Sequence, residues 1–161
     1  MTSPPAALDP RPASVEPIAL ADLVAQLPLV RTVQTGDVRV CGLTLASADV
    51  RPGDLYAALP GRNTHGASFA AGAVRAGAAA VLTDPAGADA EGRIGVPLLV
   101  VADPRAVLGD LAAAVYRHPA EQMLTLGVTG TNGKTTVTYL LESVLRSADF
   151  PLPSRSTLTV I

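Results

Sequence analysis

The sequence is poor in aromatic residues, in positive charge and in long apolar runs, and each shortage excludes a class of function. Of its 161 residues 3% are aromatic, none is tryptophan, and the formal net charge is −2. Nucleic-acid-binding surfaces need basic patches and stacking rings, so this composition argues against a nucleic-acid partner. Because no uninterrupted apolar run approaches the roughly 18 residues that a membrane helix requires, we expect no membrane span.

Cysteine is also scarce: Cys41 is the only one, so it cannot form an internal disulfide. It stands in an expected strand with no activating group nearby in sequence, and we interpret it as a buried structural thiol. Residues 1–17 contain five prolines but no basic start followed by an apolar block. We therefore expect a disordered leader, no signal peptide, and a cytoplasmic location.

Lysine is the scarcest cation, since Lys134 stands alone beside eleven arginines. It lies in the glycine-rich stretch 127–136, Gly-Val-Thr-Gly-Thr-Asn-Gly-Lys-Thr-Thr, which follows the short apolar run Leu124 to Val128. Apolar residues then recur at helical spacing, at Val137, Leu140, Leu141, Val144 and Leu145. Strand, glycine loop and helix in this order predict a phosphate-binding loop, or P-loop.

In such a loop, glycines let the backbone amides turn toward a polyphosphate, and the helix adds the positive end of its dipole. We expect Lys134 to be the catalytic cation that reaches the β and γ phosphates of ATP, and Thr135 to ligate a magnesium ion. The predicted nucleotide-binding residues are Gly130, Thr131, Asn132, Gly133, Lys134, Thr135 and Thr136. The usual Gly-x-x-x-x-Gly-Lys-Ser/Thr pattern has glycine where this chain has Val128. The alternative is a Gly/Thr-rich turn with a solvated lysine.

The rest of the chain alternates helices with short apolar strands, which predicts an α/β fold with a largely parallel sheet. Expected strands cover 39–45, 55–59, 79–82 and 97–101, and expected loops cover 62–66 and 84–95. Expected helices cover 18–27, the segment after Gly66 with Phe69, Ala73 and Val74 inward, and the segment from Pro104.

We place a domain boundary near residues 118–123. The predicted organisation is a leader (1–17), an amino-terminal domain (18–120), the start of a central ATP-binding domain (121–149) and an atypical tail (150–161). The second domain would hold one strand, the P-loop and one helix, and is incomplete, because a parallel strand needs helices on both faces of its sheet.

Residues 130–136 and the run 51–61, Arg-Pro-Gly-Asp-Leu-Tyr-Ala-Ala-Leu-Pro-Gly, resemble the Mur ligases of peptidoglycan synthesis. A further similarity is Gly-Ala-Ala-Ala-Val at 77–81. The resemblance extends from about residue 43 to 147 and is greatest to the members that add the third peptide residue. It implies an ATP-dependent and Mg²⁺-dependent amide ligase that joins meso-diaminopimelate, or lysine, to UDP-MurNAc-L-Ala-D-Glu through an acyl phosphate.

The resemblance also implies that the amino-terminal domain binds the UDP-sugar. The implied contacts are Leu45 and Ser47 on one loop and Arg62, Asn63 and Thr64 on another. Many members read Asp-Ser-Arg where this chain has Ala-Ser-Ala at 46–48. The alternative is a pair of solvated loops with Leu45 in the core. We interpret His65 and His118 as surface loop histidines without a spaced partner.

Members of the family also use a carbamylated lysine for a second magnesium, a residue that this chain lacks because Lys134 is its only lysine. We therefore expect that the isolated chain does not ligate. We also expect the protein to be a monomer. Three other interpretations stay open: the related ligase that adds D-Ala-D-Ala, a module that binds a nucleotide or nucleotide-sugar without catalysis, and an unstable fragment.

Overall fold

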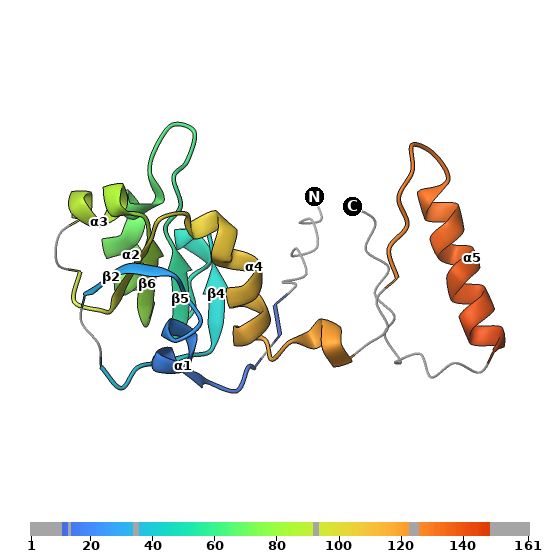
Figure 1. Ribbon diagram of the computed structural model, residues 1–161, viewed down its shortest axis with the longest axis horizontal. Coiled ribbons are helices and arrows are strands. Elements are labelled where there is room, and N and C mark those ends of the chain that lie inside the picture. The colour runs from blue at the N-terminus through green and yellow to red at the C-terminus, as the bar shows by residue number, and fades with distance from the viewer. Residues whose placement is uncertain (1–10, 13, 34–35, 92–93, 123–125, 149–161) are drawn as a thin grey trace, which may run out of the picture. The chain divides into compact units, whose positions relative to one another are not determined.

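The computed structural model describes residues 11–148 except residues 13, 34–35, 92–93 and 123–125. The chain divides into two compact units, the first unit (residues 1–122) and the second unit (residues 123–161). The first unit holds a layered α/β fold, and the second holds one long helix (Figure 1). Within the described residues, no helix combines the length and the apolar character needed to cross a membrane.

A five-stranded sheet in the order β2-β7-β6-β5-β4 forms the centre of the first unit. Its strands are β2 (Leu29–Val33), β4 (Gly42–Thr44), β5 (Asp54–Ala57), β6 (Ala80–Thr83) and β7 (Leu98–Val101). The last four are mutually parallel, and β2 runs antiparallel to β7 at one side. The expected α/β class with a mostly parallel sheet is therefore confirmed.

Helices cover both faces of this sheet, and the apolar strands alternate their side chains between two cores. On one face, Leu55, Leu82 and Leu99 pack with α1 (Leu20–Val24) and α4 (Pro104–Val115). On the other, Tyr56, Val81 and Val100 pack with η2 (Gly66–Phe69), α2 (Ala70–Arg75) and α3 (Pro85–Glu91). Because each of these strands is buried on both sides, it reads as a continuous apolar run.

Two elements differ from the sequence prediction. Residues 84–95 were expected to be a loop, but α3 occupies Pro85–Glu91. The Asp84 side chain caps this helix, accepting a hydrogen bond from Gly87 N at 2.8 Å, and Pro85 stands where a missing N–H costs nothing. Strand β2 was not predicted at all, because its central Arg31 and Thr32 interrupt the apolar pattern.

The amino-terminal elements are shorter than expected. The predicted helix 18–27 is split into β1 (Ile18–Ala19) and α1, and β1 pairs with β3 (Arg39–Val40) in a small antiparallel sheet. Cys41 breaks the predicted strand 39–45 in two and is half-buried, not buried, with its Sγ 3.5 Å from Pro52 O.

Phe69 was expected to face inward but is 49% exposed.

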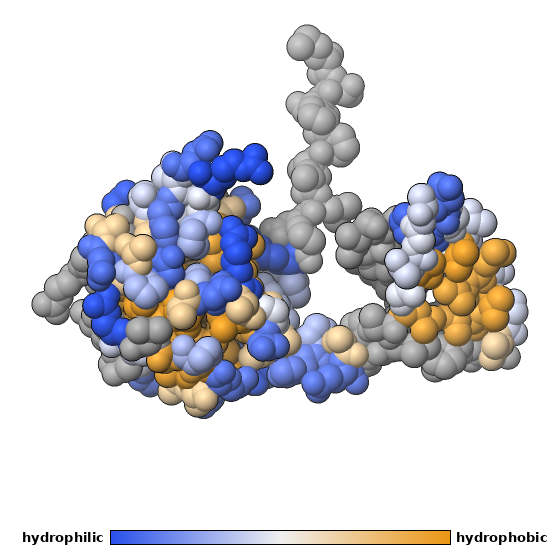
Figure 2. Space-filling view, turned by 45° about the horizontal axis from the view of Figure 1, so that its top comes forward, coloured by the Kyte–Doolittle hydropathy of each residue, from blue (hydrophilic) through white to orange (hydrophobic). Residues whose placement is uncertain are grey.

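In the second unit, α5 (Lys134–Ser147) confirms the helix predicted after the glycine loop. A strand was expected at 124–128; residues 124 and 125 lie outside the described residues, and 126–128 are not in a strand. A strand needs a hydrogen-bonded neighbour, and α5 is the only regular element described in this unit. Apolar side chains are exposed on the surface of this unit (Figure 2). The large ones are Leu126, before the glycine loop, and Val137, Tyr139, Leu140 and Val144 on α5.

Candidate functional site

The predicted P-loop turns directly into α5 at Gly133. This glycine is the N-cap of the helix and has a φ of 78°, a left-handed conformation that glycine adopts without strain. Its carbonyl accepts a hydrogen bond from Val137 N at 2.9 Å. Gly130 also has a positive φ, of 153°. The glycines at 130 and 133 thus provide the turns that a loop before a helix N-terminus needs.

Lys134, the first residue of α5, folds its side chain back over this loop. Its Nζ donates a hydrogen bond to Gly130 O at 2.7 Å. The side chains of Thr131, Asn132, Thr135 and Thr136 are exposed. The ammonium group is therefore held against its own loop by a residue at the N-terminus of α5.

These residues fit a phosphate better than they fit a metal ion. Backbone amides, a helix N-terminus and a lysine form a cradle for anionic oxygens. Among the residues that the structure describes, no group of three or more His, Cys, Asp or Glu side chains could hold a metal. Thr135 offers an exposed hydroxyl at the start of α5, and further magnesium ligands would come from phosphate oxygens and water.

The predicted sugar-binding residues lie on two loops of the first unit that follow adjacent parallel strands. Leu45 and Ser47 follow β4, while Arg62, Asn63 and Thr64 follow β5. Carboxyl ends of parallel strands meet at one edge of a sheet, where ligands of α/β proteins usually bind. We call this the carboxyl edge, where β4, β5, β6 and β7 end.

The exposure of these side chains tests the alternative in which Leu45 lies in the core. Leu45 is 56% exposed, so it is not a core residue. Ser47, which begins η1 (Ser47–Asp49), is half-buried, and Arg62, Asn63 and Thr64 are exposed. The loop from Pro60 to His65 extends well beyond the sheet (Figure 1). All five side chains are thus placed at the surface of the carboxyl edge or close below it.

The base of the 60–65 loop is closed by hydrogen bonds. Gly66 N donates to Leu59 O at 2.8 Å, and the buried Tyr56 hydroxyl donates to Gly66 O at 2.9 Å. At the amino-terminal end of the loop, the Arg105 guanidinium donates a hydrogen bond to Pro60 O at 2.8 Å. The loop therefore leaves and rejoins the body of the unit at fixed points.

His65 ends this loop, and the interpretation of it as a histidine without a partner is wrong. Its Nε2 lies 3.0 Å from Asp84 Oδ1, and its Nδ1 accepts a hydrogen bond from Ala67 N at 3.0 Å. Asp84 follows β6, so a third strand end contributes to the carboxyl edge. His118 also has a partner, Glu121, at 3.4 Å, although both side chains are largely exposed.

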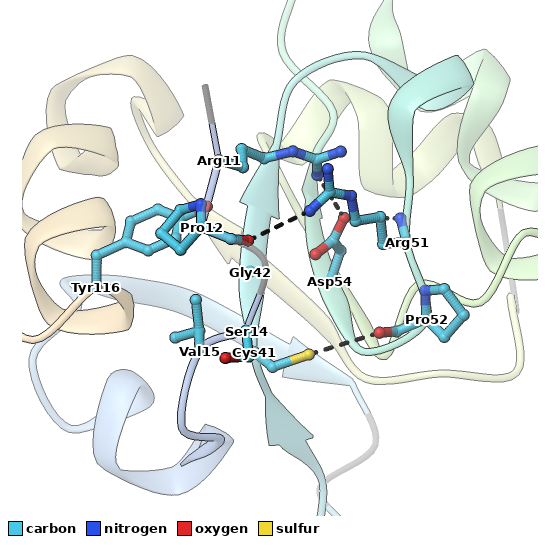
Figure 3. A pocket seen from close by; sticks show the side chains of 10 residues that line it. All are labelled: Arg11, Pro12, Ser14, Val15, Cys41, Gly42, Arg51, Pro52, Asp54 and Tyr116. Atoms are coloured by element: carbon cyan, nitrogen blue, oxygen red, sulfur yellow. Dashed lines mark hydrogen bonds and ion pairs between the residues drawn. The ribbon is translucent and has the colours of Figure 1, made fainter. Parts of the chain in front are cut away.

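A cavity of about 130 Å³ lies at the opposite, amino edge of the sheet (Figure 3). Residues before or at the start of β4 and β5 line one part of it, among them Cys41, Arg51 and Asp54. The rest of the lining comes from Arg11, Pro12, Ser14, Val15 and Tyr116. Asp54 is 2% exposed and accepts hydrogen bonds from Arg11 Nη1 at 3.0 Å and Arg51 N at 2.8 Å. Arg11 was expected in the disordered leader, so this part of that prediction is corrected: the residue pairs with the sheet.

Comparison with known proteins gives a family match. The family model described as "Mur ligase family, catalytic domain" matches residues 39–116, which contain β4 to β7 and both loops of the carboxyl edge. The match lies entirely within the first unit and does not include the predicted P-loop.

Among curated proteins, the chain is 52% identical over 139 residues to a UDP-N-acetylmuramoyl-L-alanyl-D-glutamate--2,6-diaminopimelate ligase of Streptomyces coelicolor, covering 86% of this chain and 27% of that protein. It is 51% identical over 146 residues to a UDP-N-acetylmuramyl-tripeptide synthetase of Leifsonia xyli subsp. xyli, covering 90% and 28%. The chain thus spans about a quarter of the length of these relatives.

Solved structures agree with this match. A UDP-N-acetylmuramoylalanyl-D-glutamyl-2,6-diaminopimelate--D-alanyl-D-alanyl ligase from Acinetobacter baumannii is similar with a TM-score of 0.60 at 26% identity, over 83% of this chain and 29% of that one. A UDP-N-acetylmuramoyl-L-alanyl-D-glutamate--2,6-diaminopimelate ligase is similar with a TM-score of 0.57 at 26% identity, over 83% and 26%. The chain carries a domain of the Mur ligase family.

Proposed function

We propose that this chain is the amino-terminal part of an ATP-dependent ligase of peptidoglycan precursor synthesis. The proposed enzyme adds meso-diaminopimelate, or lysine, to UDP-MurNAc-L-Ala-D-Glu. The names of relatives at 51% and 52% identity support this reaction. The observation that carries the proposal is that the 45–47 and 60–65 loops lie at the carboxyl edge of a Mur ligase family sheet, in a chain that continues into a glycine-rich loop and helix α5.

In this proposal the first unit binds the UDP-sugar. Arg62 supplies a guanidinium that can pair with the diphosphate, while Ser47, Asn63 and Thr64 supply donors and acceptors for uracil and ribose. Leu45, with an exposed apolar side chain, offers a surface for the base. These residues follow neighbouring strands, so one nucleotide can reach both loops.

The second unit would bind the triphosphate of ATP. When bound, ATP with Mg²⁺ supplies the phosphoryl group that activates the terminal carboxylate of the UDP-sugar peptide as an acyl phosphate; the incoming amine then forms the amide and releases phosphate. Lys134 would exchange its hydrogen bond to Gly130 O for phosphate oxygens and offset their negative charge. Thr135 would direct its hydroxyl to the magnesium ion.

We further propose that the protein acts as a monomer in the cytoplasm and that the isolated chain does not ligate. The described residues provide a single helix next to the P-loop, and a ligase also needs a site for the incoming amino acid. Purified chain incubated with ATP, Mg²⁺, UDP-MurNAc-L-Ala-D-Glu and meso-diaminopimelate should release no phosphate above background. Turnover would show that the chain holds a complete active site.

Two related functions compete with this one. The similarity to the Acinetobacter baumannii ligase, with a TM-score of 0.60, keeps the enzyme that adds D-Ala-D-Ala as a candidate. A binding module without catalysis would use the same two loops and the same P-loop. The curated relatives at 51% and 52% identity are a tripeptide synthetase and a diaminopimelate ligase, which favours the third-residue enzyme, whereas the solved structures of the two kinds of ligase are equally identical to this chain, at 26%.

Calorimetry tests the proposal directly. The full chain is titrated with UDP-MurNAc-L-Ala-D-Glu and, separately, with ATP and Mg²⁺. We expect the double variant R62A/N63A to lose UDP-sugar affinity while ATP binding stays unchanged, because both side chains are exposed and lie in the first unit. Equal UDP-sugar affinity in the variant and the parent chain would contradict the assignment of the 60–65 loop.

A further inference from the structure

We propose that His65 and Asp84 act as a positioning pair that fixes the 60–65 loop for the UDP-sugar. This inference rests on the proposed function of that loop. It concerns the shape of the loop and not the chemistry of ligation. Neither residue was predicted as part of the site, and the two are separated by 19 positions in the sequence.

The hydrogen bonds of His65 indicate which nitrogen of its imidazole carries the proton. Nδ1 accepts from Ala67 N, so the ring proton is on Nε2, which donates to Asp84 Oδ1 at 3.0 Å. The same Oδ1 accepts from Gly87 N at 2.8 Å. Both side chains are partly buried, with exposed fractions of 24% and 16%. His65 thereby connects the start of η2 to the start of α3.

This arrangement leaves the imidazole no free nitrogen for acid–base chemistry. A general acid or base must offer one ring nitrogen to the reacting group. In His65 one nitrogen caps the backbone and the other holds Asp84. The pair therefore acts by holding the chain in place, and His65 is a positioning residue.

Gly87 and Thr83 pack closely around the imidazole ring of His65. A Cβ atom added to Gly87 would lie 2.6 Å from His65 Cε1 and closer still to Thr83 Oγ1, so only glycine leaves room for the histidine there. Thr83 itself is 1% exposed and donates to Ala58 O at 3.0 Å, next to the base of the loop. The imidazole thus sits in a fitted space between β6 and α3.

The consequence for the loop follows from the chain order. Arg62, Asn63 and Thr64 directly precede His65, and the loop is tied on its first side by Arg105 and at its base by Leu59 and Gly66. The His65 to Asp84 hydrogen bond ties the second side. Without it, the exposed residues gain conformational freedom that binding must remove, and such ordering costs affinity.

The test compares variants of His65 that keep only one of its two hydrogen bonds, either the one from Ala67 N or the one to Asp84. His65→Asn retains an oxygen that can cap Ala67 N but is too short to reach Asp84, whereas His65→Gln retains a donor that can reach Asp84. His118→Asn, at the other histidine, is the matched control. Calorimetry with UDP-MurNAc-L-Ala-D-Glu should show that H65N weakens affinity about tenfold or more, that H65Q recovers part of it, and that H118N stays within about twofold.

All four proteins should remain folded with a single cooperative melting transition, and ATP affinity should not change, because the predicted P-loop lies in the second unit. Undiminished UDP-sugar affinity in H65N would overturn the proposal. If H65N melts markedly earlier, the same comparison is made between Asp84→Asn, whose amide oxygen still accepts both hydrogen bonds, and Asp84→Ala. The proposal then requires the larger loss in D84A, and equal affinities overturn it.

Failure of the proposed function gives a different result. If the parent chain binds no UDP-sugar, nitrogen-15 relaxation of the free protein still tests the positioning pair. Backbone amides of residues 61–64 should have lower order parameters in H65N than in the parent chain and in H118N. Identical order parameters would show that the pair does not restrain the loop.

Discussion

The ammonium group of Lys134 is already bound to a carbonyl of the loop that it is proposed to serve. Its hydrogen bond to Gly130 O is at the surface, where replacement by a phosphate oxygen requires no change in the fold. A charged donor paired with phosphate is stronger than one paired with a neutral carbonyl. The state seen in the structure is thus compatible with a loop ready to accept a polyphosphate.

Replacing Lys134 by alanine should weaken ATP binding about tenfold or more, because a hydrogen bond to a charged group is worth about 1.5–3 kcal/mol. Arg146→Ala removes a cation from the same helix and serves as the control, since it pairs with Glu142 far from the loop. Melting temperatures of both variants should match that of the parent chain. Equal ATP affinity in K134A and R146A would exclude the P-loop assignment.

Replacing glycine by alanine should have opposite effects on the free energy of unfolding at Gly66 and at Gly109. A Cβ at Gly66 would lie 2.8 Å from Leu59 N and 2.9 Å from Leu59 O, so G66A should destabilise by about 1–3 kcal/mol. Gly109 lies exposed within α4 with nothing near its Cβ position, so G109A should stabilise by about 0.5–1 kcal/mol. Chemical denaturation measures both, and a stabilised G66A would show that the loop base is not tightly packed.

The segment after α4 has a strained backbone at Arg117 and His118. The φ of His118 is 49° and that of Arg117 is 62°, and a non-glycine residue pays about 1–2 kcal/mol for this left-handed conformation. H118G should therefore raise the free energy of unfolding by up to about 1 kcal/mol, despite the loss of the exposed side-chain contact with Glu121. Denaturant titration against H118A distinguishes this backbone effect, because alanine keeps the strain; no difference between the two would refute it.

At the scale of elements, strands and helices that are buried on both sides or strongly periodic were predictable. β5 to β7 read as continuous apolar runs, and α4 begins at Pro104, as its pattern indicates. Edge strand β2 was missed because pairing with β7, and not its own composition, defines it. The glycines in 84–95 concealed α3, although Asp84 and Pro85 are typical of a helix start.

The candidate site was predictable only in part. Sequence placed the loops after β4 and β5, and their common edge follows from parallel pairing. The His65 to Asp84 contact could not be foreseen, because it depends on which strand ends lie next to β5 in the sheet. Likewise, Leu45 looks like a core residue by type, and only its position past the strand end exposes it.

Helix α4 offers a direct test of capping. Asp103 Oδ1 accepts hydrogen bonds from Arg105 N at 2.9 Å and Ala106 N at 3.3 Å. Replacement by alanine leaves both amides without this acceptor and should destabilise the first unit by about 1 kcal/mol. Asp103→Asn keeps an oxygen in the same place and should change stability by only a few tenths of a kcal/mol. Equal losses in both variants would mean that charge, not the cap, matters.

At the scale of the whole molecule, stability resides in the first unit. Both apolar cores are formed by residues between Ile18 and Tyr116, and α5 contributes to neither. A chain ending at Gln122 should therefore melt within about 2 °C of the full chain, a difference of less than about 1 kcal/mol. Calorimetric melting curves test this, and a much lower transition would show that the second unit supports the sheet.

The central claim is that the carboxyl edge, and not the cavity at the amino edge, receives the UDP-sugar. The most direct measurement is the change in backbone amide chemical shifts when UDP-MurNAc-L-Ala-D-Glu is added to the nitrogen-15-labelled chain. The account predicts the largest changes at residues 45–47 and 62–66, with little change at Cys41, Arg51 and Asp54. Changes centred on those three residues, or none in the first unit, would contradict it.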